Sequence, residues 1–573
     1  MEVLLKYRGR SGLNESFLSE RGFQRQTLSL APNLARDPVA FDAPILQPLR
    51  FREAISALHD VVISDLRFEP KDHTAYEAWK KAEQLKSAAL RREAFKNAQQ
   101  EILARQANIP ANLVEQYEDY RKKYWAARQK YSDYLLEHDK DLWRKLMPCD
   151  PVVTVADDVV FFECFSADES SYGCLSVNRG DGFGESQQLK FGTTNVDYSW
   201  DLYDHFQSLR NYRETRFSVD PEGIEVATHS PVATNYREEK IDLPAGWLRG
   251  FMQVQVAMGL PLRKVSLSRE AVYNILAWHK RHKARKSPRA LRFELQSGKP
   301  PVLMMEPWEQ QVVSHTTRYD GPADGPIRIW GTRRLLSLAR VLPLVDSFDV
   351  YLLGTGLPSF WIARMGEMRL TLGLSGWTTN DWTNASALDL LLPEAAPASG
   401  IVTRAADYLR KERSARFEQI RSAILCDAAT CAAALNQLAR TGQVIHDLDA
   451  RVYRWRQIMP QVVGEQDLGA VNPEQYGAKH ILGNHPFKID TNEIREGKRY
   501  LRAVVREHPV ELTLDMDGLI KEGKCSCSHH RSGGLRRGPC RHLLALRQAA
   551  MQETPGTAAQ QDWYDALLKW ANN

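Results

Sequence analysis

The sequence predicts a multidomain protein of the α+β class. Its 573 residues are enough for about three or four domains rather than one. Between residues 148 and 398, short apolar runs and alternating patterns typical of strands outnumber helical patterns, without the regular alternation that a parallel sheet would require. The composition, with 43% hydrophobic and 26% charged residues, is ordinary for a chain that buries several cores, which excludes a disordered or fibrous protein.

Residues 1–70 are predicted to be an N-terminal α/β part of the body. Strand-like runs occur at 3–5 and 28–30, and Arg52–Val62 has the apolar spacing of a helix. The start of the chain lacks an apolar signal core, and no apolar run is long enough to span a membrane. We therefore expect neither export nor a membrane partner.

Residues 71–147 are predicted to form a coiled-coil-like helical hairpin inserted into the body. The segment is rich in Ala, Lys, Arg, Glu and Gln, contains no Gly, and has a single Pro, Pro110, where two antiparallel helices would be connected. The second helix carries a seam with heptad spacing. The seam residues are Leu113, Tyr117, Tyr120, Tyr124, Ala127, Tyr131, Tyr134 and His138. This seam either packs within the hairpin, as we expect, or forms an arm that grips a partner.

The α+β body is predicted to continue over residues 148–398. Val159–Phe165 has the pattern of a buried strand, and Thr215–Val219 with 223–226 that of a hairpin. Ser266 and Ser268 are predicted to introduce an amphipathic helix that begins at Ser268 and has a capping residue at its start. Further strands are expected at 290–295, 301–305, 327–330, 348–353 and 369–374.

After a linker at Pro393–Gly400, residues 401–460 are predicted to form a winged-helix-like domain. Three short helices and a hairpin about a tight Asp-Leu-Asp turn are expected, and this order resembles a winged helix-turn-helix. The helices are expected at 401–412, 416–425 and 428–441, and the hairpin at 443–456. The third helix has Arg440 as its only cation and Asn436 and Gln437 as its only amides, so we do not expect it to recognise a base sequence.

The strongest chemical signal is a group of three cysteines and one histidine in the pattern Cys-x-Cys, twelve residues, Cys-x-His. These residues are Cys525, Cys527, Cys540 and His542. Three thiolates and an imidazole are the ligand set of a closed, tetrahedral structural zinc site. We expect a strand at 511–515, a returning strand at 519–527 that places both cysteines of Cys-x-Cys on one face, and a helix at 540–548. A bound Zn²⁺ would stabilise such a small fold.

This ligand pattern, with the expected hairpin and helix, resembles the SWIM-type zinc finger family. The resemblance covers about residues 505–548, and all four ligand positions match. It implies that residues 461–573 are a SWIM zinc finger domain with a C-terminal helix, and the chain as a whole is similar to uncharacterised bacterial SWIM-domain proteins. The family's finger binds DNA or protein and is not itself an enzyme. Some of the similar bacterial proteins accompany AAA ATPases of the MoxR type and von Willebrand A proteins, which implies such a system as a source of partners.

Elsewhere the sequence has no motif of a catalytic machinery. It contains no P-loop, no dinucleotide-binding turn, no His-Glu-x-x-His and no Gly-x-Ser-x-Gly, so we predict a protein that is not an enzyme and has no small-molecule substrate. His279 and His282 are either a metal or catalytic pair or, as we expect, solvated groups at a basic helix end. His529 and His530 are likewise expected to be solvated rather than to compete as ligands, and Trp382 to be a buried aromatic of a turn.

The other cysteines are too few and too scattered for a disulfide scaffold, which predicts reduced thiols in a cytoplasmic protein. They are Cys149, Cys164, Cys174, Cys426 and Cys431.

Positive charge concentrates at the predicted finger. From Lys524 to Ala550 the chain has six basic and no acidic residues, whereas the net charge of the whole chain is only +5. The predicted nucleic-acid-binding residues are Lys524, Arg531, Arg536, Arg537 and Arg541. We therefore predict a zinc-binding protein whose finger binds DNA or RNA without strong sequence specificity. The alternative is a scaffold or adaptor for protein partners, which the slightly acidic remainder of the chain favours.

Overall fold

The structure, a computed structural model, describes most of the chain outside residues 63–150. The described residues are 4–8, 12–17, 24–30, 39–62, 151–166, 168–196, 206–207, 209–212, 214–219, 237–241, 245–260, 262–283, 288–322, 325–376, 382, 399–458, 473–496, 498–515, 520–532, 534–537 and 539–552. The chain divides into two compact units, Asp65–Pro148 and the remainder. The predicted helical hairpin at 71–147 lies outside the described residues. Several sheets and helices in the described part confirm the predicted α+β class.

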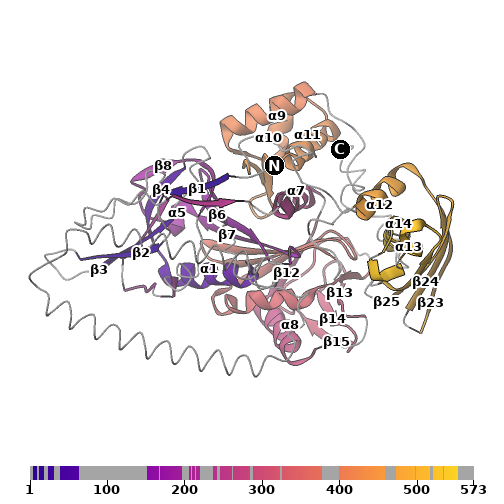
Figure 1. Cartoon of the computed structure of the whole chain (residues 1–573). Coiled ribbons are helices and arrows are strands. Elements are labelled where there is room, and N and C mark those ends of the chain that lie inside the picture. Colours follow the sequence, from indigo (N-terminus) through magenta and orange to yellow (C-terminus); the bar gives the residue numbers. More distant parts are fainter. Residues whose placement is uncertain are drawn as a thin grey trace, which may run out of the picture. The chain divides into compact units, whose positions relative to one another are not determined.

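The largest sheet in the described part of the chain has eight strands, and all neighbouring strands in it are antiparallel. Figure 1 labels some of these strands. In spatial order they are β12 (Arg263–Ser268), β17 (Ser347–Leu352), β18 (Ser359–Met365), β19 (Met368–Leu374), β7 (Ser171–Asn178), β6 (Val159–Phe165), β5 (Val152–Val155) and β9 (Gly192–Asn195). Every residue of β6 is buried, which confirms the buried strand predicted there.

Helices cover both faces of this sheet. For this reason β6 lacks the alternation of apolar and polar residues that is typical of a strand with one face exposed to solvent. Helix α1 (Pro48–Val62) packs on one face against Gly173, where an added Cβ would lie 2.8 Å from the nearest α1 side-chain atom. Helix α7 (Ala245–Gly259) packs on the other face, where Gly250 lies against the ring of Phe165. The glycines allow both helices to approach the sheet closely.

A second sheet has five strands and mixes directions, because β10 pairs parallel with β3 and antiparallel with β4. In spatial order its strands are β2 (Gly12–Phe17), β3 (Gln24–Leu30), β10 (Glu214–Val219), β4 (Ala40–Ile45) and β8 (Gln188–Lys190). The hairpin predicted for Thr215–Val219 with 223–226 is wrong, because β3 and β4 occupy both edges of β10. Residues 223–226 themselves lie outside the described residues. Separately, β1 (Leu4–Arg8) pairs with β11 (Arg237–Ile241).

A third, antiparallel sheet of four strands lies next to helix α8 (Arg269–Arg281). Its strands in spatial order are β15 (Gln310–Val313), β14 (Val302–Met305), β13 (Leu291–Glu294) and β16 (Ile327–Ile329). The Ser268 hydroxyl accepts a hydrogen bond from the Ala271 N–H at 3.2 Å, which confirms the predicted helix cap. Shorter elements of the body are α5 (Arg179–Gly182), η1 (Thr332–Ala339) and η2 (Leu342–Leu344).

The two histidines at the end of α8 differ from the solvated pair expected there. His279 is buried where α8 packs against η1, and burial, followed by the positive charge of Arg333, lowers its pKa to about 4. His282 stacks on Trp278, with 3.8 Å between the ring centroids. Trp382 is fully buried, as predicted. The basic residues at this end of α8 did not indicate that η1 covers the side of the helix that carries His279.

Residues 399–458 contain three helices followed by a β-hairpin, close to the positions predicted for them. The elements are α9 (Ser399–Glu412), β20 (Ser414–Ala415), α10 (Phe417–Ile424), α11 (Ala428–Arg440), β21 (Val444–Asp447) and β22 (Val452–Trp455). The Asp427 carboxylate caps α11 by accepting from the Thr430 N–H at 2.9 Å. Most of α11 is buried, because α9 and α7 both pack against it.

A fully buried ion pair fixes this segment to the largest sheet. The side chains of Arg456 and Glu163 are both 0% exposed, and Arg456 Nε donates to Glu163 Oε2 at 2.7 Å. The Tyr172 hydroxyl donates to the same carboxylate at 2.6 Å, and the Arg456 guanidinium lies 4.9 Å from the centroid of the Phe251 ring. The two buried charges therefore have both an opposite charge and additional hydrogen-bonding or aromatic partners.

The turn between β21 and β22 makes further contacts with the same sheet. Asp449 accepts hydrogen bonds from Arg364 and Arg369, which belong to β18 and β19. The Tyr351 hydroxyl of β17 donates to the Leu448 carbonyl at 3.2 Å. The hairpin therefore lies against the body along its turn as well as at its end.

Residues 473–552 form a separate antiparallel sheet with helices packed on one face. The elements are α12 (Pro473–Asn484), β23 (Ile489–Arg495), β24 (Lys498–Val505), β25 (His508–Asp515), β26 (Ile520–Cys525), α13 (Ser528–Arg531), η5 (Gly534–Arg537) and α14 (Arg541–Gln552). Exposed and buried residues alternate along β24, so one face of the sheet meets water and the other packs on α14. No helix in the described part of the chain is long and apolar enough to cross a membrane.

Replacing Glu163 by Gln should lower the free energy of unfolding of the body by about 3–5 kcal/mol, because it leaves the Arg456 charge buried without a counter-charge. Chemical denaturation followed by tyrosine and tryptophan fluorescence measures this loss. The matched control is Glu418→Gln, which removes the exposed Arg421–Glu418 pair on α10 and should cost less than about 0.5 kcal/mol. Equal losses for the two variants would contradict a special role for the buried pair.

The low pKa of His279 makes stability depend on pH. Because the folded pKa is about 4 and the unfolded value about 6.5, the unfolded chain binds more protons between these values, and stability falls as pH drops through this window. Between pH 7 and pH 5, His279 should contribute a loss of about 2 kcal/mol, which His279→Gln should remove. Urea unfolding at the two pH values measures the difference, and Asn274→Ala, an exposed change on the same helix, should leave it unaltered.

Candidate metal centre

The first ligand residue of the centre is fixed by a strand. Cys525 is the last residue of β26 and pairs in register with Val510 of β25. Side chains alternate along a strand, so Cys525 points into the core while its neighbour Lys524 points to the outer face. The Cys527 N–H donates a hydrogen bond to the Cys525 sulfur.

The second ligand residue begins a helix instead of continuing the strand. The predicted strand at 519–527 ends at Cys525, and Cys527 is the N-cap of α13, its sulfur accepting from the His530 N–H at 3.4 Å. The prediction that both cysteines share one strand face is therefore wrong. The chain turns between them, and this turn allows both sulfurs to reach the same point.

The third ligand residue also stands at a helix start. Cys540 directly precedes α14, its carbonyl accepts from the Leu544 N–H at 3.0 Å, and its sulfur accepts from the Leu543 N–H. Backbone N–H groups at the start of a helix favour negative charge. All three sulfurs thus accept a backbone N–H.

His542, in the first turn of α14, completes the group. The four ligand atoms lie within 4.8 Å of one another and all four residues are buried. The Cys525 sulfur is 3.7 Å from His542 Nδ1. In a tetrahedral zinc site with Zn–S bonds of about 2.3 Å and Zn–N bonds of about 2.0 Å, a sulfur and a nitrogen ligand lie about 3.5 Å apart. The arrangement can therefore hold one metal ion.

Cys525 and Cys540 are joined by a hydrogen bond between their sulfurs. The hydrogen bond from the Cys525 thiol to the Cys540 sulfur holds the pKa of Cys540 well below its usual range and raises the pKa of Cys525. The group thus favours a thiolate at neutral pH, which is the form that binds a metal.

Glu474, from the first turn of α12, supports the centre from outside. Its carboxylate accepts from the Arg541 backbone N–H at 2.7 Å, which caps α14, and from Arg541 Nη2 at 2.7 Å. Gly477 leaves room for the arginine, since an added Cβ would lie 2.9 Å from it. The sequence did not predict Glu474, because it lies 67 residues before Arg541 and no local pattern links the two.

His508 is a second residue that the sequence analysis did not single out. Its ring lies 4.5 Å from the His542 ring, and its Nδ1 lies 2.9 Å from the Ser526 hydroxyl oxygen. His529 and His530 are half-buried in α13 and so only partly solvated, and neither belongs to the group of four candidate ligands. The short helix that starts at Cys527 holds both residues against the module.

The predicted nucleic-acid-binding residues come from several elements of the module. Lys524 lies on the outer face of the sheet, where its Nζ is 3.5 Å from Glu511 Oε2, whereas Arg541 is paired with Glu474. Arg531 is exposed and has no ion-pair partner among the described residues. Arg536 and Arg537 belong to η5, between the second and third ligands, and their side chains are outside what the structure describes.

Replacing Cys540 by Ser should remove the bound metal and unfold residues 473–552, because it deletes one of four ligands in a small core. The metal content per chain, measured by mass spectrometry, should fall from one equivalent toward zero. Limited proteolysis should then cut the C-terminal region first, while the body remains resistant. Cys426→Ser, which changes a half-exposed thiol outside the group, should keep both properties unchanged. Full metal content in Cys540→Ser would overturn the ligand assignment.

Comparison with known proteins adds little to this geometry. No family model and no curated protein matches the chain. Among solved structures, proliferating cellular nuclear antigen from Entamoeba histolytica is 13% identical, with 40% of this chain and 90% of that chain covered and a TM-score of 0.27. The PCNA2–PCNA3 complex from Sulfolobus tokodaii is 10% identical, with 40% of this chain and 90% of that chain covered and a TM-score of 0.27. The C-terminal region of FEN-1 bound to A. fulgidus PCNA is 13% identical, with 41% of this chain and 92% of that chain covered and a TM-score of 0.27. At these TM-scores the similarity supports no conclusion about this chain.

Proposed function

We propose that residues 473–552 are a SWIM-type zinc finger that binds nucleic acid through phosphate contacts, and that the protein is a binding protein and not an enzyme. The observation that carries the proposal is the buried group of Cys525, Cys527, Cys540 and His542, which holds both ends of a basic loop. The spacing of these ligands, a hairpin before them and a helix after them are what the resemblance to the family rests on.

Zinc is the metal that this ligand set favours. Thiolates and imidazole together suit Zn²⁺, whereas Mg²⁺ and Ca²⁺ prefer oxygen ligands. Because the protein supplies all four ligands, no position is left open for water or a substrate. We therefore assign the metal a structural role, in agreement with a non-enzymatic protein.

The loop from Ser528 to Pro539 is the proposed contact with nucleic acid. Arg531, Arg536 and Arg537 lie in it, and the sequence has no acidic residue from Gly523 to Gln552. Metal ligation at both ends of the loop keeps these charges near one another, and three clustered cations give salt-dependent attraction to phosphates. Since phosphates carry no base information, the binding would have little sequence specificity.

We propose that residues 399–458 are a winged helix with a structural role. Its order of helices and strands matches that motif, but α11, the helix that would enter a DNA groove, packs against α7 and α9. The turn of the hairpin pairs with Arg364 and Arg369 of the body. Both DNA-contacting parts of such a domain are thus engaged within the chain.

One observation favours a second candidate function, a scaffold for a protein partner. The outer face of the finger's sheet exposes apolar side chains, with Tyr500 36% and Val504 54% exposed. Exposed apolar and aromatic groups beside charged ones are typical of protein interfaces. A partner from an AAA ATPase and von Willebrand A system would be one candidate for this face.

Matched variants distinguish DNA binding by the loop from protein binding by the outer face of the sheet. Fluorescence anisotropy with a labelled duplex and a labelled single strand, at about 50 and 200 mM salt, should give wild-type affinities that fall steeply with salt. Replacing Arg531, Arg536 and Arg537 by Ala should weaken binding to all sequences alike and make the slope of log K against log salt shallower by up to about 2.7.

The control is Lys524→Ala, which removes a similarly exposed cation from the other face of the sheet and should leave the affinity nearly unchanged. If Lys524→Ala weakens binding as much as the triple variant does, the loop is not the contact. If the wild type does not bind at the lower salt concentration, the nucleic-acid proposal fails and the scaffold becomes the better assignment.

A further inference from the structure

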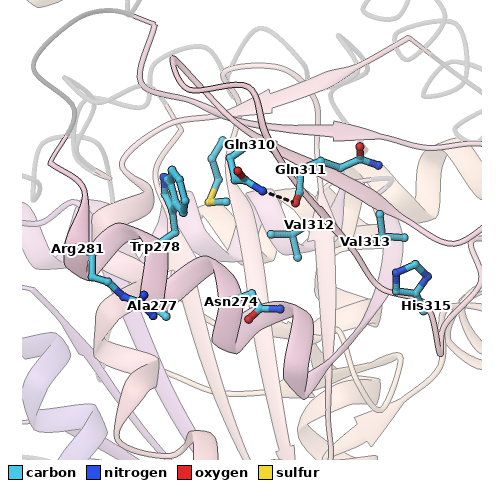
Figure 2. Close-up of a pocket in the computed structure, with 10 residues that line it drawn as sticks. Asn274, Ala277, Trp278, Arg281, Gln310, Gln311, Val312, Val313 and His315 are labelled. Carbon is cyan, nitrogen blue, oxygen red and sulfur yellow. Dashed lines mark hydrogen bonds between the residues drawn. The ribbon is translucent and has the colours of Figure 1, made fainter.

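A groove of about 590 Å³ lies between helix α8 and strand β15, far along the chain from the metal centre (Figure 2). Asn274, Trp278 and Arg281 line it from the helix, and Gln311, Val312 and Val313 from the strand. Its volume is within the usual range for a ligand site, and its walls combine apolar and polar groups. Neither the metal centre nor the proposed loop uses any of these residues.

Strand β15 offers free backbone groups to this groove. It is the edge strand of its sheet in the described part of the chain, with β14 on one side only. The Ser314 N–H donates to the Pro301 carbonyl on the β14 side at 3.0 Å. Because backbone groups alternate along an antiparallel strand, those of Gln311 and Val313 point to the free edge. The Gln311 carbonyl accepts only from the side chain of its neighbour Gln310 there, at 3.2 Å.

The opposite wall provides a preformed aromatic surface. The Trp278 ring is held between His282, stacked at 3.8 Å, and Trp308, edge-on at 5.9 Å. Its Nε1 is buried and has no hydrogen-bond partner among the described residues.

The charged residues around the groove indicate the sign of the charge that a ligand would carry. No residue that lines the groove is acidic, whereas Arg281 lines it and Lys280 is exposed next to Arg281. The nearby carboxylate of Glu309 accepts from Arg292 at 2.7 Å. A negatively charged ligand is therefore complementary to this site.

We propose that this groove binds an extended acidic peptide segment of a partner protein, which adds to β15 as a further strand. The peptide backbone pairs with Gln311 and Val313, one apolar side chain packs on Trp278 and Val312, and a carboxylate contacts Arg281. Strand addition of this kind obtains affinity from backbone hydrogen bonds and specificity from alternate side chains. The inference is independent of the finger and its ligand.

The test selects peptides from a random displayed library on the full-length, metal-containing chain, with counter-selection on the Arg281→Glu variant. The enriched sequences should combine acidic with apolar residues at alternating positions. Labelled copies should bind in fluorescence anisotropy, and Val313→Pro, which deletes only the outward-facing N–H, should weaken binding about tenfold. Arg281→Glu should weaken it by a similar factor, and Tyr273→Ala, an exposed change beside the groove, should not.

Hydrogen exchange supplies a readout that does not depend on any variant. Binding of a selected peptide should slow exchange of the amides of Gln311 and Val313, and a proline placed at its central position should abolish this effect. The proposal is overturned if no peptide depends on Arg281 and Val313, or if the proline-containing peptide binds equally well. It is also overturned if these amides are already protected in the free chain, or if an oligonucleotide displaces the selected peptides from the groove.

Discussion

The buried pair of Arg456 and Glu163 is the constraint on which the arrangement of the larger unit depends. An ionised carboxylate at the centre of an apolar strand is tolerated only with a counter-charge, and that counter-charge comes from a segment nearly 300 residues further along the chain. If residues 399–458 moved away from the sheet, Glu163 would therefore lose its counter-charge, or become exposed to water. Gln255 adds to this: with its amide oriented to suit its neighbours, it donates to the Ala439 and Val444 carbonyls of the same segment.

The body and the C-terminal module differ in the interactions that stabilise them. The body is held by a large apolar core with a few fully paired charges inside it. The C-terminal module has a much smaller core, and Cys525, Cys527 and Cys540 of the candidate metal centre are members of it. A metal bound there would therefore cross-link residues that also form the hydrophobic core.

Much of this could be predicted from the sequence where a local pattern carries the information. The strand at Val159–Phe165, the cap at Ser268 and the ligand group are all set by near neighbours in sequence. What could not be predicted depends on contacts between distant segments. Three examples are the pairing of β10 on both of its edges, the burial of His279 under η1 and the capping of α14 by Glu474. Each depends on a partner that is distant in sequence and that no local residue spacing predicts. Lys524 shows the same effect: it is adjacent to Cys525 in sequence, but strand alternation places it on the opposite face.

The placement of Cys527 and Cys540 at two helix starts has a further consequence. A metal bound there would close the loop between them much as a disulfide would, and would hold the two ends of the loop together. The entropy of closing a loop grows slowly with its length, at about 0.6 kcal/mol for each doubling. Longer insertions between the two cysteines would therefore cost little folding free energy. The loop that we propose as the contact surface could change in length while the metal site stays the same.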